Sequence, residues 1–159
     1  MKSKKERMEE NKMSNTESKP EFTIKEYFEH LKEGNLIGCK CKKCNSLYLP
    51  PRKICSNCYS TDLEAYNFKG TGKLATYSLI HVGTRYFVLQ GYKMNKPYCF
   101  GIVELDEGLK IAAHIVGPTK EFEFDPNNFK IGMPLKMKIL KIEISGQEPH
   151  YDLGFEPLM

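Results

Sequence analysis

Two Cys-X-X-Cys pairs constrain this 159-residue chain more than any other feature of its sequence. Cys41 and Cys44 form the first pair, Cys55 and Cys58 form the second, and residues 45–54 separate them. Each pair brings two thiolates to one ion, and two pairs complete the tetrahedron that zinc accepts. The spacing therefore predicts a structural zinc site, which does not catalyse because no coordination position is left open.

Two alternatives to a zinc site, an iron site and a redox dithiol, have less support from the sequence. Iron also accepts four thiolates, so an iron-containing electron carrier is an alternative interpretation, which metal analysis would decide. A redox dithiol would need one pair at a helix start in a βαβ setting, which the sequence does not offer. Cys39 lies two residues before the first pair, and Cys99 lies in an apolar run, where a free cysteine behaves as a small hydrophobe.

Charge and hydropathy exclude several classes of protein. The net charge is +4, and residues 1–20 supply half of it through six basic and four acidic side chains. We predict that this polar segment is a disordered tail, and Met13 is an alternative start of translation. The remainder is close to balanced, which is not the charge signature of a strong nucleic-acid binder. Without a run of about 20 apolar residues or a secretory signal, we expect a cytoplasmic protein and no membrane span.

Residues 21–36 are expected to hold one amphipathic helix. Thr23 and Glu26 fit a capping box at its start, and Gly34 fits a left-handed stop at its end. An apolar stripe follows the helical period, formed by Ile24, Tyr27, Phe28 and Leu31. So short a helix must dock this stripe to be stable, either on its own chain or on a partner subunit.

The rest of the chain is predicted to be mainly β, with a zinc ribbon at residues 37–67 and a barrel domain at residues 68–159. Strand patterns cover residues 74–82, 98–105, 109–116 and 135–144, while 85–92 is a looser aromatic run. About five strands in so short a segment indicate a small closed barrel, and an OB-fold is the obvious candidate. No nucleophile, base or phosphate-binding loop is recognisable, so the sequence predicts no active site of its own.

The order of motifs resembles a known family of acyl-CoA-associated proteins. The likeness rests on residues 37–44, Pro50-Pro51-Arg52, Cys55–Cys58, residues 70–78 and 97–108, and Ile131-Gly132-Met133, and it spans about residues 21–157. The family joins a rubredoxin-like zinc ribbon to an OB-fold and was long described as a domain of unknown function. Cys39 and Cys99 depart from its usual pattern.

The resemblance implies a function that the residues alone do not. Family members are non-catalytic partner subunits of thiolases, such as benzoylsuccinyl-CoA thiolase, or of archaeal complexes of acetoacetyl-CoA thiolase and hydroxymethylglutaryl-CoA synthase. It therefore implies a hetero-oligomer that helps to bind acyl-CoA and to close the active site, with thiolytic cleavage of an aromatic acyl-CoA as one possibility.

Two sets of side chains are candidates for these roles. The cations around the cysteine pairs either form a solvated surface or face the phosphates of CoA; they are Lys42, Lys43, Arg52 and Lys53. Aromatic side chains that either line the interface or belong to the core are Tyr27, Phe28, Tyr86, Phe87 and Tyr92. The alternative function is a module that binds single-stranded nucleic acid, because zinc ribbons and OB-folds both occur there.

Overall fold

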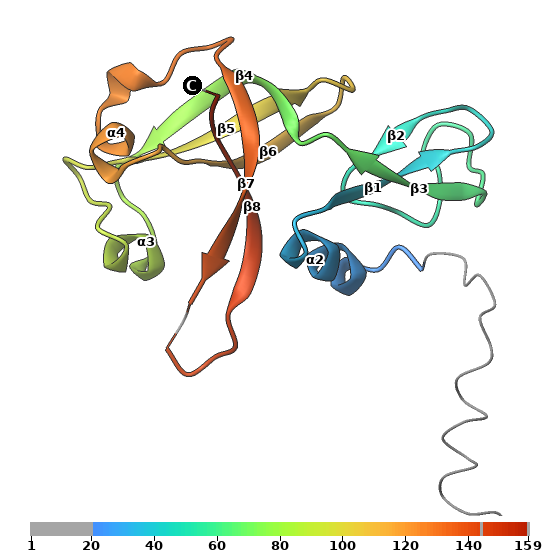
Figure 1. The fold of residues 1–159 in the computed structure, drawn as a ribbon, viewed down its shortest axis with the longest axis horizontal. Helices are drawn as coiled ribbons and strands as arrows, with labels where there is room; N and C mark the ends of the chain where they lie inside the picture. Colours follow the sequence, from blue (N-terminus) through green and yellow to red (C-terminus); the bar gives the residue numbers. More distant parts are fainter. Residues whose placement is uncertain (1–20, 144, 159) are drawn as a thin grey trace, which may run out of the picture.

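The computed structural model describes residues 21–143 and 145–158, which form a small sheet, a closed barrel and a helix packed against both (Figure 1). The predicted mainly β fold with an N-terminal helix, a zinc ribbon and an OB-type barrel is confirmed. The expected tail at residues 1–20 and the alternative start at Met13 lie outside the described residues.

Helix α2 (Ile24–Lys32) begins and ends where the sequence predicts. Thr23 Oγ1 accepts a hydrogen bond from the backbone N–H of Glu26 at 3.2 Å, which satisfies a free donor of the first turn. Glu26 Oε2 does not make the second hydrogen bond of the predicted capping box, because it is buried without a hydrogen-bond partner among the described residues. Gly34 follows the helix at φ +87°, a left-handed conformation that glycine adopts without steric cost.

The apolar stripe of α2 is divided between the core and the surface. Tyr27 and Leu31 are buried in the main core cluster, together with residues of the ribbon and the barrel. Ile24 and Phe28 are 61% and 41% exposed. The helix therefore docks on its own chain, and half of its stripe still faces away from the core.

Three antiparallel strands build the ribbon sheet, in the order β2-β1-β3. They are β1 (Leu36–Cys41), β2 (Leu47–Tyr48) and β3 (Leu63–Phe68). The first cysteine pair begins at the last residue of β1 and ends before β2, and the second pair lies between β2 and β3. The sheet therefore delivers both pairs to the same end of the ribbon.

Five strands close the barrel in the order β4-β5-β6-β8-β7. They are β4 (Thr71–Ile80), β5 (Tyr98–Leu105), β6 (Lys110–Ile115), β7 (Pro134–Ile142) and β8 (His150–Pro157). The first three form a meander, and β8 then lies between β6 and β7, parallel to β6. This strand order is that of the five-stranded Greek-key barrel of an OB-fold.

The connections differ from the sequence expectations more than the strands do. The aromatic run at residues 85–92 contains a short helix, α3 (Arg85–Leu89). Helix α4 (Lys120–Phe124), the 3-10 turn η2 (Pro126–Asn128) and strand β8 were not predicted. Strand β8 carries Asp152 and Gly154, residues that are depleted in strands, and its pairing with β6 and β7 overrides that local preference.

One continuous apolar cluster joins helix, ribbon and barrel. Its fully buried members include Leu31 of α2, Leu36 of β1, Leu135 of β7 and Phe155 of β8. Burying such side chains stabilises each by about 1.5–3 kcal/mol relative to exposure. The ribbon and the barrel are therefore held in one arrangement by a shared core.

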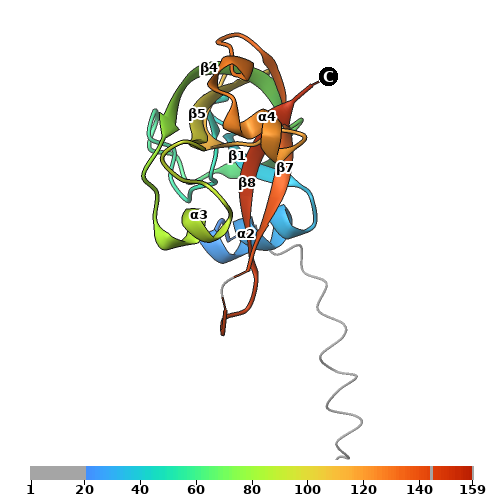
Figure 2. The ribbon, with the colours of Figure 1, turned by 90° about the vertical axis from the view of Figure 1, so that its left-hand side faces the viewer.

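The far end of the β7–β8 hairpin projects beyond the barrel, with α3 and α2 on either side of it (Figures 1 and 2). Helix α2 contacts β8, and side chains of α3 face residues of β7 across a small pocket. Among the described residues, no helix has the length and apolar character needed to cross a membrane.

Candidate functional site

The four predicted cysteines converge on one point. Their sulfur atoms all lie within 4.8 Å of one another, with 3.6 Å from Cys41 to Cys58 and 3.4 Å from Cys44 to Cys55. Zinc–thiolate bonds of about 2.3 Å place the sulfurs of a tetrahedral site about 3.8 Å apart. The donor set therefore fits a structural zinc ion, and all four positions are taken by the protein.

The two cysteine turns repeat the same backbone geometry. The amide of Cys41 donates to the carbonyl of Ser46 at 2.9 Å, and that of Cys55 donates to Ser60 at the same distance. The residue after each pair, Asn45 or Tyr59, donates back to the first cysteine and has φ near +60°. This left-handed turn aims both thiols of a pair in one direction, which prepares the site before metal arrives.

Hydroxyl groups support the thiolates from outside. Ser46 Oγ lies 3.1 Å from Cys44 Sγ, and the hydroxyl of Tyr48 lies 3.1 Å from Cys55 Sγ. The hydroxyl and backbone of Ser46 lower the pKa of the Cys44 thiol to about 5. Metal ligands must be deprotonated, so these contacts favour the thiolate form that zinc binds.

The two remaining cysteines are not part of this cluster. Cys39 Sγ accepts a hydrogen bond from the backbone N–H of Arg52 at 3.3 Å and is fully buried in the ribbon. Cys99 is 1% exposed in β5, where burial raises the pKa of its thiol to about 12. Both therefore behave as buried packing residues, as their positions in the sequence indicate.

The four candidate phosphate-binding cations are all exposed beside the cysteine turns. Lys42 forms an ion pair with Asp62 at 3.8 Å. Arg52 lies 4.5 Å from the ring centre of Tyr48 and donates to Ser56 Oγ at 3.0 Å. Arg52 is thus held in place, whereas the side chains of Lys43 and Lys53 form no ion pair with any of the described residues.

The aromatic interface candidates fall into two groups. Tyr27 and Tyr92 are only 6% and 3% exposed, so the chain itself covers them. Phe28 is exposed, and Tyr86 and Phe87 are half-buried on α3. Burial therefore leaves Phe28, Tyr86 and Phe87 as the members of this set that a partner can reach.

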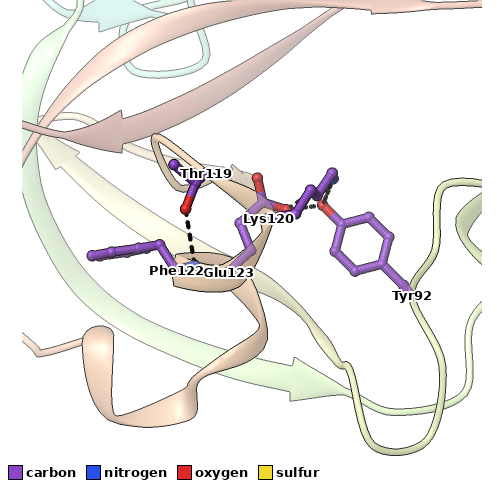
Figure 3. Close-up of polar contacts among 5 residues, drawn as sticks. All are labelled: Tyr92, Thr119, Lys120, Phe122 and Glu123. Atoms are coloured by element: carbon purple, nitrogen blue, oxygen red, sulfur yellow. Dashed lines mark hydrogen bonds and ion pairs between the residues drawn. The ribbon is translucent and has the colours of Figure 1, made fainter.

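A buried polar clamp, formed by Tyr92, Lys120 and Glu123, was not predicted from the sequence (Figure 3). The Tyr92 hydroxyl donates to the carboxylate of Glu123, which is 5% exposed. Lys120 Nζ donates to Tyr92 Oη at 2.6 Å and pairs with Glu123 at 3.0 Å. These contacts join α4 to the loop after α3. Lys120 neutralises the buried carboxylate and the Tyr92 hydroxyl hydrogen-bonds to it, so the three residues form a structural contact.

An aromatic cluster surrounds His114 beside this clamp. Phe87 stacks on Tyr98 with ring centres 3.9 Å apart, and their planes differ by 3°. The rings of Phe87, Tyr92 and Tyr98 all lie 5.7–5.8 Å from the imidazole of His114. No spacing in the sequence connects these residues, which come together only because the loop that carries α3 folds back over β6.

Comparisons with known proteins match both halves of the chain. Two family models fit: the ChsH2 rubredoxin-like zinc ribbon domain over residues 28–64, and the ChsH2 C-terminal OB-fold domain over residues 66–140. A DUF35 domain-containing scaffold protein of Methanocaldococcus jannaschii is 34% identical over 129 residues, covering 80% of this chain and 84% of that protein.

Two further similarities concern subunits of enzyme complexes. The benzoylsuccinyl-CoA thiolase subunit BbsA of Geobacter metallireducens is 30% identical over 124 residues, covering 76% of this chain and 80% of that subunit. Among solved structures, a chain of the Ltp2-ChsH2(DUF35) aldolase has a TM-score of 0.65 at 26% identity, covering 87% of this chain and 98% of that one.

Proposed function

This chain belongs to the DUF35 family of proteins that join a zinc ribbon to an OB-fold, and from this premise we propose that it is a non-catalytic subunit of a thiolase-type complex. In that complex it helps to bind an acyl-CoA and to close the active site of the catalytic partner. An aromatic acyl-CoA, such as benzoylsuccinyl-CoA, is the first substrate class to test, because similar chains are thiolase subunits named for that compound.

The observation that carries this proposal is the closed metal centre. Four thiolates saturate a tetrahedral ion, so the ion has no position left with which to polarise a substrate. A subunit with a rigid metal-pinned ribbon contributes instead by positioning the substrate of its partner and by excluding water. The scaffold and subunit names of its relatives agree with such a role.

We further propose that the cations beside the cysteine turns receive the phosphates of CoA. They are exposed, they lie on the rigid end of the ribbon, and Arg52 is already oriented by Tyr48 and Ser56. Phe28, Tyr86 and Phe87 are proposed to contact the catalytic partner, since aromatic side chains are enriched in interface cores. The reduced thiols that zinc needs make the cytoplasm the proposed location.

Affinity purification of the zinc-loaded chain from native cells tests the central proposal. We expect a thiolase-type protein to co-purify in a fixed ratio. Its turnover should fall by about 100-fold when the chain is removed, as expected for loss of substrate positioning, and should return on adding the chain back. A catalytic partner that works at full rate alone would contradict the proposal.

Charge reversal within the purified complex tests the phosphate contacts separately. Lys43→Glu with Lys53→Glu should weaken CoA binding by about 10-fold to 100-fold, because two charge-assisted contacts are lost. The matched control is Lys73→Glu with Lys130→Glu, which makes the same charge change at exposed positions of the barrel. Equal CoA affinity in both double variants would remove the phosphate contacts from the proposal and leave the subunit role standing.

A further inference from the structure

Tyr59 is an unusual residue for its place in the second cysteine turn. Its side chain is 80% exposed, so it adds little packing to the ribbon. Its φ is +58°, a left-handed conformation that is unfavourable for a bulky residue. The equivalent position of the first turn holds Asn45, a residue that tolerates this conformation. An exposed aromatic ring on a strained backbone therefore points to a use outside the fold.

Apolar surface lies on both sides of Cys55. The amide of Tyr59 donates to the carbonyl of Cys55 at 2.9 Å, which places the tyrosine next to the chain that enters the turn. Ile54 directly precedes Cys55, and its side chain is 54% exposed. Tyr59 and Ile54 therefore give this turn, which also carries two metal ligands, an apolar platform that faces solvent.

Positive charge accompanies this apolar platform. Residues 39–60 contain five cationic side chains and no acidic one. Their charge exceeds the negative charge of a zinc ion bound by four thiolates, so this end of the ribbon is positive overall. Lys42 is paired with Asp62 at 3.8 Å, whereas Lys43 and Lys53 are exposed and form no ion pair with any described residue. These two ammonium groups are therefore available to an anion.

The platform and the lysines together favour a ligand that joins a flat base to phosphate groups. Nucleobases stack on exposed aromatic side chains, and phosphate oxygens accept charge-assisted hydrogen bonds from lysine. An acyl chain alone would cover the ring and leave the lysines unpaired. Inorganic phosphate would pair with the lysines and leave the ring exposed. A phosphorylated nucleoside uses both features at once.

We propose that Tyr59 stacks on the adenine of CoA while Lys43 and Lys53 bind the phosphates at the nucleotide end of the same molecule. This inference deepens the proposed phosphate contact and rests on the proposed function for the identity of the nucleotide. It assigns the adenine end of CoA to the ribbon. The pantetheine arm and the acyl group then extend away from the ribbon, toward the active site of the catalytic partner.

NMR titration of the full-length zinc-loaded protein tests this assignment without any partner. The probes are CoA, adenosine 3′,5′-bisphosphate, inorganic pyrophosphate and pantetheine. We expect CoA and adenosine bisphosphate to bind saturably and to shift the ring protons of Tyr59 upfield, as a stacked base does. Pyrophosphate should bind about 10-fold more weakly and leave the ring protons in place, because it has no base to stack. Pantetheine should show no saturable binding.

Two substitutions at Tyr59 separate stacking from charge. Tyr59→Asn introduces the residue that the first turn has at the equivalent position, so the variant should fold and retain one zinc per chain. CoA and adenosine bisphosphate should then bind about 10-fold more weakly, while pyrophosphate affinity should not change. Tyr59→Phe keeps the ring and should bind like wild type. Phe100→Ala, which removes an exposed ring from β5, is the matched control and should leave all affinities unchanged.

Three results would overturn the proposal. The first is the absence of saturable CoA binding by the folded, zinc-loaded wild-type protein. The second is equal CoA affinity in Tyr59→Asn and wild type. The third is an oligoadenylate that binds at Tyr59 far more tightly than CoA and with a steep salt dependence, which would assign the surface to single-stranded nucleic acid. None of these results decides the subunit role, which depends on co-purification with the catalytic partner and on its turnover.

Discussion

The zinc ribbon and the barrel are ordered by different physical means. The cluster around the metal site is small, and its buried members are Phe22, Cys39, Cys41, Cys55 and Leu63. The barrel side of the molecule has a larger apolar core, whose fully buried residues include Leu74, Val103, Ile115, Leu135 and Phe155. The comparison teaches that the cysteine end of the ribbon is linked to metal binding, whereas the barrel, and the ribbon residues Leu36 and Phe68 that pack against it, are ordered by burial of apolar surface.

Removing a zinc ligand should have the largest effect and should separate the two regions. In Cys55→Ser we expect zinc to be lost and amide protection to disappear in β1–β3, because metal binding supplies about 10–16 kcal/mol in small zinc domains. The barrel should keep its protection. Metal analysis and hydrogen exchange measure both effects.

Cys39→Ser is the matched control for that experiment. Cys39 is as buried as Cys55 but lies outside the four-sulfur cluster, so this variant should retain one zinc per chain. The comparison between the regions would fail if Cys55→Ser lost its metal and kept a fully protected ribbon. A red protein with one iron would instead replace zinc as the resident ion.

Truncating the barrel core should give the reverse result. Phe155→Ala removes a fully buried ring from β8, which costs about 3–5 kcal/mol of unfolding free energy through lost burial and a cavity. Chemical denaturation should report this loss, while metal analysis should still find bound zinc. Phe100→Ala, at a ring that is 42% exposed on β5, serves as the control and should cost about 1 kcal/mol or less.

Acid should destabilise the barrel through His114. Burial lowers the pKa of this residue to about 4, whereas in the unfolded chain it is about 6.5. Between these pH values the unfolded state binds more protons, so stability should fall as the pH falls from 6.5 to 4, by about 3 kcal/mol in full. Smaller effects come from the charges of Glu123 and Asp152, which raise the pKa of the ring, and of Lys120, which lowers it.

The pH profile of His114→Phe isolates this contribution from other titrating groups. As the pH drops through this window, wild type should lose stability relative to the variant with a slope of up to about 1.4 kcal/mol per pH unit. Parallel profiles would mean that the imidazole titrates alike in the folded and unfolded chain.

The sequence predicted the features that depend on residues close together in the chain. The metal site depends on cysteines within 18 residues of one another, and fixed spacing was enough to identify all four. The β5–β6 hairpin was likewise predicted within one residue or so, because its turn at Asp106–Gly108 is local. The Thr23 cap and the Gly34 stop of α2 are local for the same reason.

Distant pairings escaped sequence reasoning. Strand β8 is ordered by β6 and β7, and its own residues carry a weak strand signal. The clamp of Tyr92 with Glu123 joins residues 31 positions apart, and His114 gains its aromatic neighbours from a loop. Each depends on tertiary packing, so neither periodicity nor motif spacing could reveal it.

Backbone strain in the cysteine turns provides the smallest test of the comparison. Tyr59 has φ +58°, a left-handed conformation that costs a residue with a Cβ atom about 1–2 kcal/mol. Its side chain is 80% exposed, so Tyr59→Gly removes little packing. The greater freedom of glycine in the unfolded chain offsets part of the relief, about 0.4–1 kcal/mol.

Tyr59→Gly should therefore stabilise the zinc-loaded ribbon by about 0.5–1 kcal/mol, a net gain that follows from these two opposing terms. Asn45 occupies the equivalent position of the first turn at φ +59°, and asparagine tolerates this conformation, so Asn45→Gly should change little. Zinc competition with a chelator and hydrogen exchange in β1–β3 measure both variants. Relief of strain in the cysteine turns acts at the end of the ribbon away from the barrel, so exchange in β4–β8 should be identical in Tyr59→Gly and wild type. A change there would show that the apolar cluster shared by ribbon, helix and barrel transmits the effect of the turn.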